Sequence, residues 1–328
     1  MAERARRESR RSVKETVPEE LDGERLDRAV AVLGGISRSV ARAIVDGGGV
    51  TVDGVLIGSA KAKVSSGSLV AFEIPTVEEV LKPHPVEYTT VYADEHLLVI
   101  DKPAGLTVHP GAGTGDETLA AGILFDRPSI EGVGQPGRWG IVHRLDRTTS
   151  GLLVVAVTQP CYEALTGMMR AREISRHYVA LVEGVMDIPR GTVDAPIGPD
   201  PNRPTRRALS PYGKHAVTHY HQRLAWPDAE VALLDVTLET GRTHQIRVHL
   251  AGIGHPVLAD RVYGGPSVVE LSGTTEPIRI SRLALHAAQL TFRHPMTGEG
   301  LAFESELPED LAGVVASLDA VPLAEPSD

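Results

Sequence analysis

The chain has very little cysteine and no long apolar segment. Its 328 residues include one cysteine, Cys161, so an intramolecular disulfide cannot form and a reducing compartment is expected. No stretch approaches the roughly 18 consecutive apolar residues of a membrane-spanning helix. The N-terminal residues also lack the apolar segment of a signal peptide. We therefore expect a soluble, cytoplasmic protein with no membrane association.

An excess of acidic residues at first argues against a nucleic-acid partner. The formal net charge is −10, but residues 304–328 contain several acidic side chains and no lysine or arginine. Basic residues cluster at 4–14, 170–176 and 203–207. Because charges act over a Debye length of about 8–10 Å, such clusters can form a basic groove on a chain that is acidic overall.

Composition and periodicity divide the chain into a small and a large domain with flanking segments. Residues 1–18 are polar and charged, which is typical of a disordered basic tail. Residues 19–75 combine two helical patterns with a strand–turn–strand pattern, which predicts a small α+β domain. Residues 76–85 contain prolines and indicate a linker to a large domain at 86–303. Residues 304–328 are expected to form an acidic C-terminal tail with a short helix.

Strand patterns outnumber helical patterns in the large domain. Residues 97–103 and 151–158 are apolar runs, and residues 175–184 alternate between apolar and polar positions. Helical patterns occur at 161–173 and 243–254. Because strands and helices do not alternate regularly, the sequence predicts an α+β fold with a mixed, largely antiparallel sheet rather than a doubly wound parallel sheet.

Three local patterns suggest other chemistry, but each lacks a required residue. His215, His219 and His221 would share one face of a strand, yet no cysteine or acidic residue lies near them in the sequence, so we expect no metal site there. Residues 109–119 contain G-x-G-x-G without the lysine of a phosphate-binding loop. The stretch "HRLDRTTSG" lacks the asparagine of a kinase catalytic loop, and the chain has no D-F-G.

Charged residues gather where apolar runs begin or end. Asp146 lies between Arg144 and Arg147, just before an apolar run, and for an isolated aspartate a salt-bridged loop carboxylate is the ordinary interpretation. Arg242 lies in a similar polar cluster, "TGRTHQIRVHL", and Tyr178 lies within a strand pattern preceded by arginines. A further cluster, "DKPAGLTVHPG", follows a buried strand pattern. Several such clusters on one α+β sheet are consistent with a single cleft formed by strand ends.

These stretches resemble motifs of the pseudouridine synthases of the RluA/RluD type. "HRLDRTTSGLL" resembles the catalytic loop of that family, "RHYVALVEG" its tyrosine strand, and "GRTHQIRVHL" its arginine motif. "DKPAGLTVHPG" and "RLALHAAQLTFRHP" resemble its first and closing motifs, so the resemblance covers residues 86–303. Residues 21–75 resemble the small RNA-binding module shared with ribosomal protein S-four. The resemblance implies the pseudouridine synthase fold and favours the subgroup that modifies large-subunit (23S) ribosomal RNA.

The resemblance also implies roles for individual residues. Asp146 would be the nucleophile that attacks the uridine, at the anomeric carbon of the ribose or at the uracil ring. Arg242 would pair with Asp146 and keep it ionised, and Tyr178 would stack on the base and is a candidate for proton removal. Arg144 would hold the flipped nucleotide or fill the gap that it leaves, and Ile246 would form an apolar wall.

Further contacts with RNA or substrate are expected at Lys102 and His109 in the first motif, and at Arg38 and Arg42 in the small domain. Isomerisation changes no oxidation state and uses no external group, so neither a cofactor nor a metal is expected. The expected partner is RNA, and the chain is taken as a monomer by default.

Two alternatives stay open at the level of sequence. The substrate could be transfer RNA, or the chain could be an RNA-binding assembly factor that keeps the fold without the chemistry. The complete set of Asp146, Tyr178 and Arg242 favours the enzyme. The small domain could also be a structural appendage, because its acidic and basic residues balance.

Overall fold

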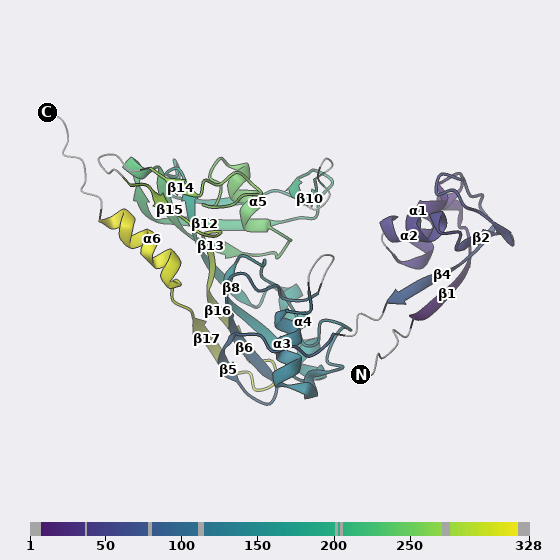
Figure 1. Ribbon diagram of the computed structural model, residues 1–328, viewed down its shortest axis with the longest axis horizontal. Helices are drawn as coiled ribbons and strands as arrows, with labels where there is room; N and C mark the ends of the chain where they lie inside the picture. The colour runs from purple at the N-terminus through teal and green to yellow at the C-terminus, as the bar shows by residue number, and fades with distance from the viewer. Residues whose placement is uncertain are drawn as a thin grey trace. The chain divides into compact units, whose positions relative to one another are not determined.

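The computed structural model describes residues 8–36, 38–77, 81–110, 115–200, 203, 206–270 and 276–320. The chain forms two compact units, Met1–Val80 and Leu81–Asp328 (Figure 1). The boundary between them falls within residues 76–85, the segment that the sequence indicates as a linker. No helix in the described ranges is both long and apolar enough to cross a membrane.

The first unit packs two helices against a small sheet. Its elements are β1 (Glu8–Thr16), η1 (Glu19–Leu21), α1 (Leu26–Gly34), α2 (Arg38–Asp46), β2 (Val50–Val52), β3 (Val55–Leu56) and β4 (Leu69–Val77). The sheet is four-stranded, with the order β1-β4-β2-β3. Asp53 and Gly54 both have positive φ in the β2–β3 turn, as a tight hairpin requires, which confirms the predicted strand–turn–strand. The helices bury apolar side chains that include Leu26, Val30 and Val45.

The prediction of a disordered tail at 1–18 is wrong for the described part of that segment. Glu8–Thr16 forms β1, which pairs antiparallel with β4 along its whole length. Val13 and Val17 are buried in the core of the first unit. Polar composition hid this strand because its stabilising partner, β4, lies more than 50 residues further along the chain.

This pairing makes Val13 important for the stability of the first unit. Val13→Asp places a charge among apolar side chains and is expected to destabilise the unit by about 3 kcal/mol or more. Hydrogen exchange of residues 69–74 in β4 measures the effect, and protection should be lost. The control is Ser12→Asp at an exposed position of the same strand. Equal protection in both variants would show that β1 does not stabilise the unit.

The second unit is built on a nine-stranded sheet with the order β5-β6-β7-β16-β8-β13-β12-β9, and β17 pairs with β16. The strands are β5 (Thr89–Ala93), β6 (Leu97–Lys102), β7 (Ser150–Ala156), β8 (Ser175–Glu183), β9 (Arg190–Asp194), β12 (Val217–Trp226), β13 (Val231–Leu238), β16 (Leu285–Arg293) and β17 (Gly300–Glu304). Only the β7–β16 pairing is parallel among the described strands of this sheet. The expected α+β fold with a mixed, largely antiparallel sheet is therefore confirmed.

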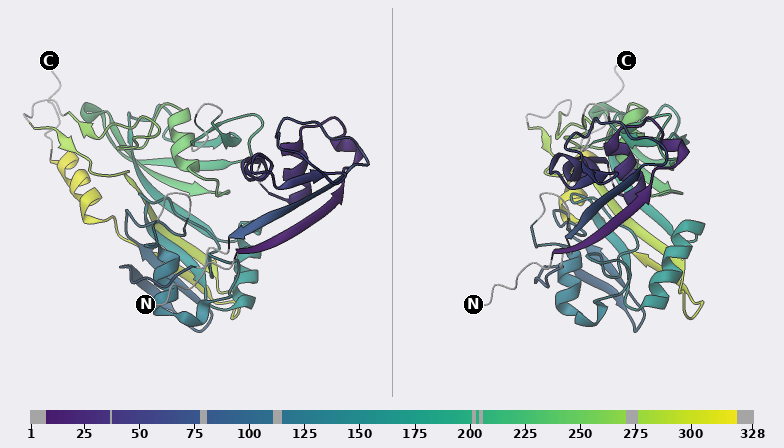
Figure 2. Two further views of the ribbon diagram at one scale, coloured as in Figure 1. Left: turned by 45° about the vertical axis from the view of Figure 1, so that its right-hand side comes forward. Right: turned by 90° about the vertical axis from the view of Figure 1, so that its right-hand side faces the viewer.

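Helical elements and two small hairpins complete this unit. The helical elements are α3 (Leu119–Asp126), η2 (Pro128–Ile130), α4 (Gln159–Ala171), η3 (Pro227–Ala229), α5 (Gln245–Gly252) and α6 (Glu309–Asp319), and the hairpins are β10 (Ile197–Pro199) with β11 (Arg207–Leu209) and β14 (Val268–Val269) with β15 (Ile278–Arg279). Figures 1 and 2 show α3 and α4 at the β5–β6 end and α5 at the β12 end. The sheet therefore connects segments that are far apart in the sequence.

The apolar run at 151–158 forms the centre of this unit. Every residue of β7 is buried, which explains why the run has no alternation. Gly151 has φ of 112°, and a Cβ atom there would collide with the Ala287 carbonyl on β16. Glycine is thus required where the two parallel strands begin, directly after the loop that carries Asp146.

The described part of the C-terminal segment, residues 304–320, belongs to the second unit, so the domain boundary predicted at 303 is wrong. The short helix expected there is α6, and it buries Leu311, Val314 and Leu318. Asp310 in its first turn forms a two-point ion pair with Arg282, and acidic residues at that end suit the helix dipole. The segment is acidic overall, but one face of α6 is apolar and packs on the second unit.

Candidate active site

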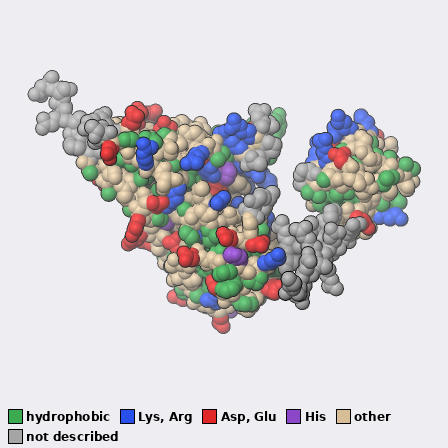
Figure 3. Space-filling view, viewed as in Figure 1, with side chains coloured by type: hydrophobic (Ala, Val, Ile, Leu, Met, Phe, Trp, Pro, Cys, Tyr) green, Lys and Arg blue, Asp and Glu red, His purple; other side chains and the backbone are tan. Residues whose placement is uncertain are grey.

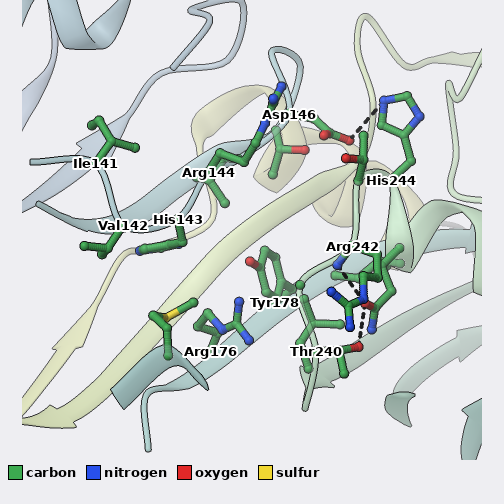
Figure 4. Close-up of a pocket in the computed structure, with 18 of the residues that line it drawn as sticks. Ile141, Val142, His143, Arg144, Asp146, Arg176, Tyr178, Thr240, Arg242 and His244 are labelled. Atoms are coloured by element: carbon green, nitrogen blue, oxygen red, sulfur yellow. Dashed lines mark hydrogen bonds and ion pairs between the residues drawn. The ribbon is translucent and has the colours of Figure 1, made fainter. Parts of the chain in front are cut away.

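The second unit contains a cavity of about 670 Å³, which lies in the range of small-molecule sites. Its walls come from the 143–149 loop, from β8 and from the segment that leads into α5 (Figure 4). Figure 3 shows lysine and arginine side chains gathered around α5 and β10 on the visible face of this unit. The lining side chains with a charge are mostly arginines, namely Arg138, Arg144, Arg170, Arg172, Arg176, Arg242 and Arg247, against the acids Asp146 and Glu239. Such a lining favours an anionic ligand.

The loop before β7 holds Asp146 at the cavity. Leu145 is buried and anchors the loop, while the residues on either side of the Leu145–Asp146 pair, Arg144 and Arg147, are exposed. The carbonyl of Asp146 accepts a hydrogen bond from the Thr149 amide at 3.1 Å, which closes a tight turn. The side chain of Asp146 is 16% exposed, so its carboxylate is sheltered but reachable from the cavity.

The cation that pairs with Asp146 is Arg247. Its Nη1 donates to Asp146 Oδ2 at 3.0 Å, while Nε and Nη2 donate to both oxygens of Asp260 at 2.7 and 2.8 Å. Arg247 and Asp260 are both buried. One guanidinium therefore fixes a structural carboxylate and the carboxylate in the cavity at the same time.

The predicted pair of Arg242 with Asp146 is wrong. Arg242 lines the cavity, but its Nε donates to the His215 carbonyl at 3.0 Å and its amide donates to the Gln245 side chain. Arg242 precedes α5, whereas Arg247 lies in the first turn of that helix and points inward. A signal for Arg247 was present in the sequence, because an arginine inside the buried stretch "QIRVHL" needs an acidic partner.

Tyr178 and Arg176 form one side of the cavity from β8. Tyr178 lies at the middle of the sheet, between Val236 of β13 and Ala287 of β16, and burial raises the pKa of its phenol. Arg176 is buried two residues earlier on the same face of the strand, and its Nε has no hydrogen-bond partner among the described residues. In Figure 4 both side chains lie on the side of the cavity across from Asp146.

The remaining predicted residues of this unit have different environments. Ile246 is buried in the cavity wall. His109 also lines the cavity, accepts a long hydrogen bond from Arg144 at 3.4 Å, and has a pKa lowered to about 4 by burial and by the cations of Arg138 and Arg144. The structure therefore brings Asp146, Tyr178, Ile246, Arg144 and His109 to one cavity.

The prediction of a substrate contact at Lys102 is wrong. Lys102 is fully buried at the end of β6, outside the cavity lining, and burial lowers its pKa to about 7. Its Nζ donates to the carbonyls of Pro103 and Leu106 at 2.7 and 2.9 Å, and reaches the Arg147 carbonyl at 3.4 Å. A buried ammonium group requires hydrogen-bond acceptors, and these three carbonyls supply them. Lys102 thus joins the first motif to the loop of Asp146.

Two other groups of predicted residues lie away from this cavity. In the first unit, Arg38 contacts Asp27 at 3.2 Å and Arg42 contacts Asp46 at 3.3 Å, and both arginines are more than half exposed. Their RNA contacts stay a prediction. Folding brings a different carboxylate to each of three histidines that were considered for a metal: Asp194 to His215, Glu239 to His219 and Asp235 to His221. No cluster with the composition of a metal site occurs in the described ranges.

His143 gives the stability of this unit a dependence on pH. Its Nε2 accepts a hydrogen bond from the Val154 amide at 3.0 Å, and burial together with the Arg176 cation lowers its pKa to about 3. Between pH 3 and 6.5 the unfolded chain takes up a proton that the folded chain does not, so stability falls as the pH falls. The glutamine of His143→Gln can also accept a hydrogen bond, but it does not titrate. Between pH 6.5 and 4.5 the free energy of unfolding of this variant should therefore fall by about 2 kcal/mol less than that of the wild type.

Urea unfolding at both pH values measures this difference, and His221→Gln at an exposed position is the control. The same loss in the wild type and in His143→Gln would contradict the account of a neutral His143.

Two family models match this chain, and named relatives align with most of its length. Residues 96–252 match the family described as "RNA pseudouridylate synthase", and residues 24–70 match the "S4 domain". "Ribosomal large subunit pseudouridine synthase D" of Vibrio cholerae is 41% identical over 310 residues, covering 93% of this chain and 94% of that protein. The protein of the same name from Nitrosomonas europaea is 41% identical over 318 residues, covering 96% and 90%.

Solved structures show the same fold for the larger part of the chain. "Human RNA Pseudouridylate Synthase Domain Containing 1" aligns with a TM-score of 0.51 at 25% identity, covering 73% of this chain and 97% of that one. "Human RNA Pseudouridylate Synthase Domain Containing 4" aligns with a TM-score of 0.53 at 24% identity, covering 70% and 92%.

Proposed function

Since the chain belongs to the RNA pseudouridine synthase family and is therefore an isomerase acting on RNA, we propose that it converts uridine to pseudouridine in large-subunit ribosomal RNA with Asp146 as nucleophile. The observation that carries this proposal is the Asp146 carboxylate, sheltered in an arginine-rich cavity and paired with Arg247. The Arg247 guanidinium donates to one carboxylate oxygen of Asp146 at 3.0 Å, and a covalent route uses such a fixed carboxylate as its nucleophile.

The bond changes balance without any external reagent. The carboxylate attacks the anomeric carbon or the uracil ring, and the bond between N1 and the ribose breaks. The detached uracil turns and joins the ribose through C5, and the bond to Asp146 breaks, which restores the carboxylate. The hydrogen at C5 leaves as a proton while N1 gains one. No oxidation state changes overall, so the reaction needs no redox cofactor, in keeping with the expectation from the sequence.

The target base has to leave its helix to reach Asp146. Extrusion costs a few kcal/mol, and stacking on an aromatic side chain recovers about 1–3 kcal/mol. Tyr178 is the aromatic group of the cavity wall on β8 that can supply this stacking, with Ile246 as an apolar neighbour. Arg144 is exposed on the loop two residues before Asp146, and its guanidinium would hold the flipped nucleotide or fill the gap that it leaves.

Two features support ribosomal RNA as the substrate. The relatives from Vibrio cholerae and Nitrosomonas europaea, which each align over more than nine-tenths of this chain, are named as large-subunit pseudouridine synthases. The first unit matches the S4 domain, and Arg38 and Arg42 on α2 offer exposed cations for RNA phosphates. A ribosomal substrate would fit the cytoplasmic location expected from the sequence, and the monomeric state stays a prediction.

Release of tritium from uridine labelled at C5 tests the proposal, because only isomerisation expels that hydrogen. The wild-type chain is incubated with labelled 23S ribosomal RNA and, separately, with labelled transfer RNA. We expect release from the ribosomal RNA alone. Release from transfer RNA alone would identify transfer RNA as the substrate instead. Binding of RNA without release of tritium from either RNA would favour a non-catalytic assembly factor.

A further inference from the structure

His244 lies beside Asp146 in an unusual backbone conformation. Its Nε2 is 3.8 Å from Asp146 Oδ2, on the same oxygen that Arg247 contacts (Figure 4). His244 precedes α5 with φ of 59°, in the left-handed region that residues other than glycine rarely occupy. Such backbone strain persists where surrounding contacts enforce it, and often at functional sites.

A chain of hydrogen bonds connects His244 to Tyr263 and to the backbone of Arg207. The backbone N–H of Arg207 donates to the hydroxyl oxygen of Tyr263 at 3.1 Å. That hydroxyl lies 2.9 Å from His244 Nδ1. The Tyr263 oxygen accepts from this backbone amide, and we assign its own proton to the bond with Nδ1. The neutral imidazole then has its proton on Nε2, facing Asp146.

The neutral state of His244 agrees with its surroundings. Burial lowers the pKa of His244, although the charges of Asp146 and Asp260 oppose this effect. The cations of Arg247 and Arg144 act in the same direction as burial. A neutral imidazole with its hydrogen on Nε2 can donate a hydrogen bond to the Asp146 carboxylate without a change in its own charge.

Tyr263 is held firmly enough to orient His244. Two guanidinium groups lie over its ring, with Arg206 at 4.7 Å and Arg247 at 5.1 Å from the ring centre, which are cation–π distances. Its backbone amide contacts Asp260 Oδ1 at 3.2 Å, and the residue is buried. The hydroxyl therefore has a fixed position relative to the helix start that carries His244.

We propose that His244 is a positioning residue for Asp146, oriented by Tyr263 through this hydrogen-bond chain; the inference rests on the proposed function of Asp146. Arg247 and His244 both direct N–H groups at Oδ2 of Asp146. Oδ1 has no hydrogen-bond partner among the described residues and is the oxygen presented to the nucleoside. The 3.8 Å separation shortens to a hydrogen bond when RNA closes the site, as catalytic hydrogen bonds commonly do on substrate binding.

Single-turnover kinetics on preformed enzyme–RNA complexes test the role of His244. Loss of a hydrogen bond to a charged group should lower the isomerisation rate about 10- to 100-fold in His244→Ala, with RNA affinity unchanged. His244→Gln places an amide N–H near the position of Nε2 and should recover most of the rate. An unchanged rate in His244→Ala, or a loss confined to RNA affinity, would overturn the proposal.

A double-mutant cycle tests the link to Tyr263. Tyr263→Phe keeps the ring and its contacts with the two arginines and removes only the hydroxyl, so this variant should fold. Its rate should fall about threefold to tenfold, since a hydrogen bond between neutral groups is the weaker kind. In the His244→Ala background the same change should have no further effect, because Tyr263 acts through His244. Equal rate losses in both backgrounds would overturn the proposed chain.

Two controls keep these results separate from folding and from the proposed function. Tyr220→Phe removes a hydroxyl from β12, away from the cavity, and should leave the rate unchanged. If the wild type isomerises uridine and His244→Ala is equally fast, only the proposed role of His244 is overturned. A wild-type chain that isomerises no uridine in any RNA overturns the proposed function as well.

Discussion

Asp146→Asn should abolish pseudouridine formation while leaving the fold and RNA affinity close to those of the wild type. Asparagine has nearly the shape of aspartate, but its amide is neutral and is not a nucleophile. Losing the nucleophile of a covalent route commonly costs about 10⁴-fold or more in rate. Arg247 keeps its two-point contact with Asp260, so the local structure retains its main ion pair.

Single-turnover formation of pseudouridine in 23S ribosomal RNA measures this effect, and a binding titration measures RNA affinity. The matched control is Asp228→Asn, which removes a negative charge at an exposed position of η3. Product formation by Asp146→Asn at a rate within tenfold of the wild type would remove Asp146 from its proposed role.

Arg247→Met should damage both the reaction and the stability of the second unit. Removing one partner of a buried ion pair costs about 3–5 kcal/mol, because Asp260 is left as a buried carboxylate without its cation. The loss of positive charge at Asp146 should also lower the isomerisation rate by about 10²- to 10³-fold. Arg247→Lys should recover little of the rate, since an ammonium cannot form the two-sided contact.

Two further variants separate these effects. Adding Asp260→Asn to Arg247→Met removes the unpaired charge, so thermal stability should partly return while the rate stays low. Arg242→Met should lower the rate at least tenfold less than Arg247→Met, since Arg242 has no contact with Asp146. The reverse order of Arg242 and Arg247 would contradict the pairing seen in the structure.

Much of the fold could be predicted from local patterns. The fully apolar run of β7 and the glycine-stopped helix α5 have clear signals in the sequence, because each reflects burial of its own residues. β1 has no such signal, since its residues are mainly polar and its stability comes from pairing with β4. The acidic segment after β17 was likewise assigned to a tail, although three apolar residues of α6 pack on the unit.

Parts of the active site could be predicted and parts could not. Motif resemblance correctly brought Asp146 and Tyr178 to one cavity. It assigned the pairing cation to Arg242 and not to Arg247, because the sequence does not show that Arg242 precedes α5 while Arg247 lies in its buried first turn. Asp260 and Tyr263 were missed because they reach the site through contacts between loops and leave no local pattern.

The central claim is that Asp146 attacks a uridine swung out of its helix into this cavity. A crystal structure of Asp146→Asn with a substrate RNA tests it most directly, because this variant should hold the uridine unreacted. We predict a flipped target uridine against Tyr178, with the side chain of residue 146 about 3–3.5 Å from the anomeric carbon or the uracil ring. A uridine that stays stacked in its helix, or that meets another carboxylate instead, would contradict the account.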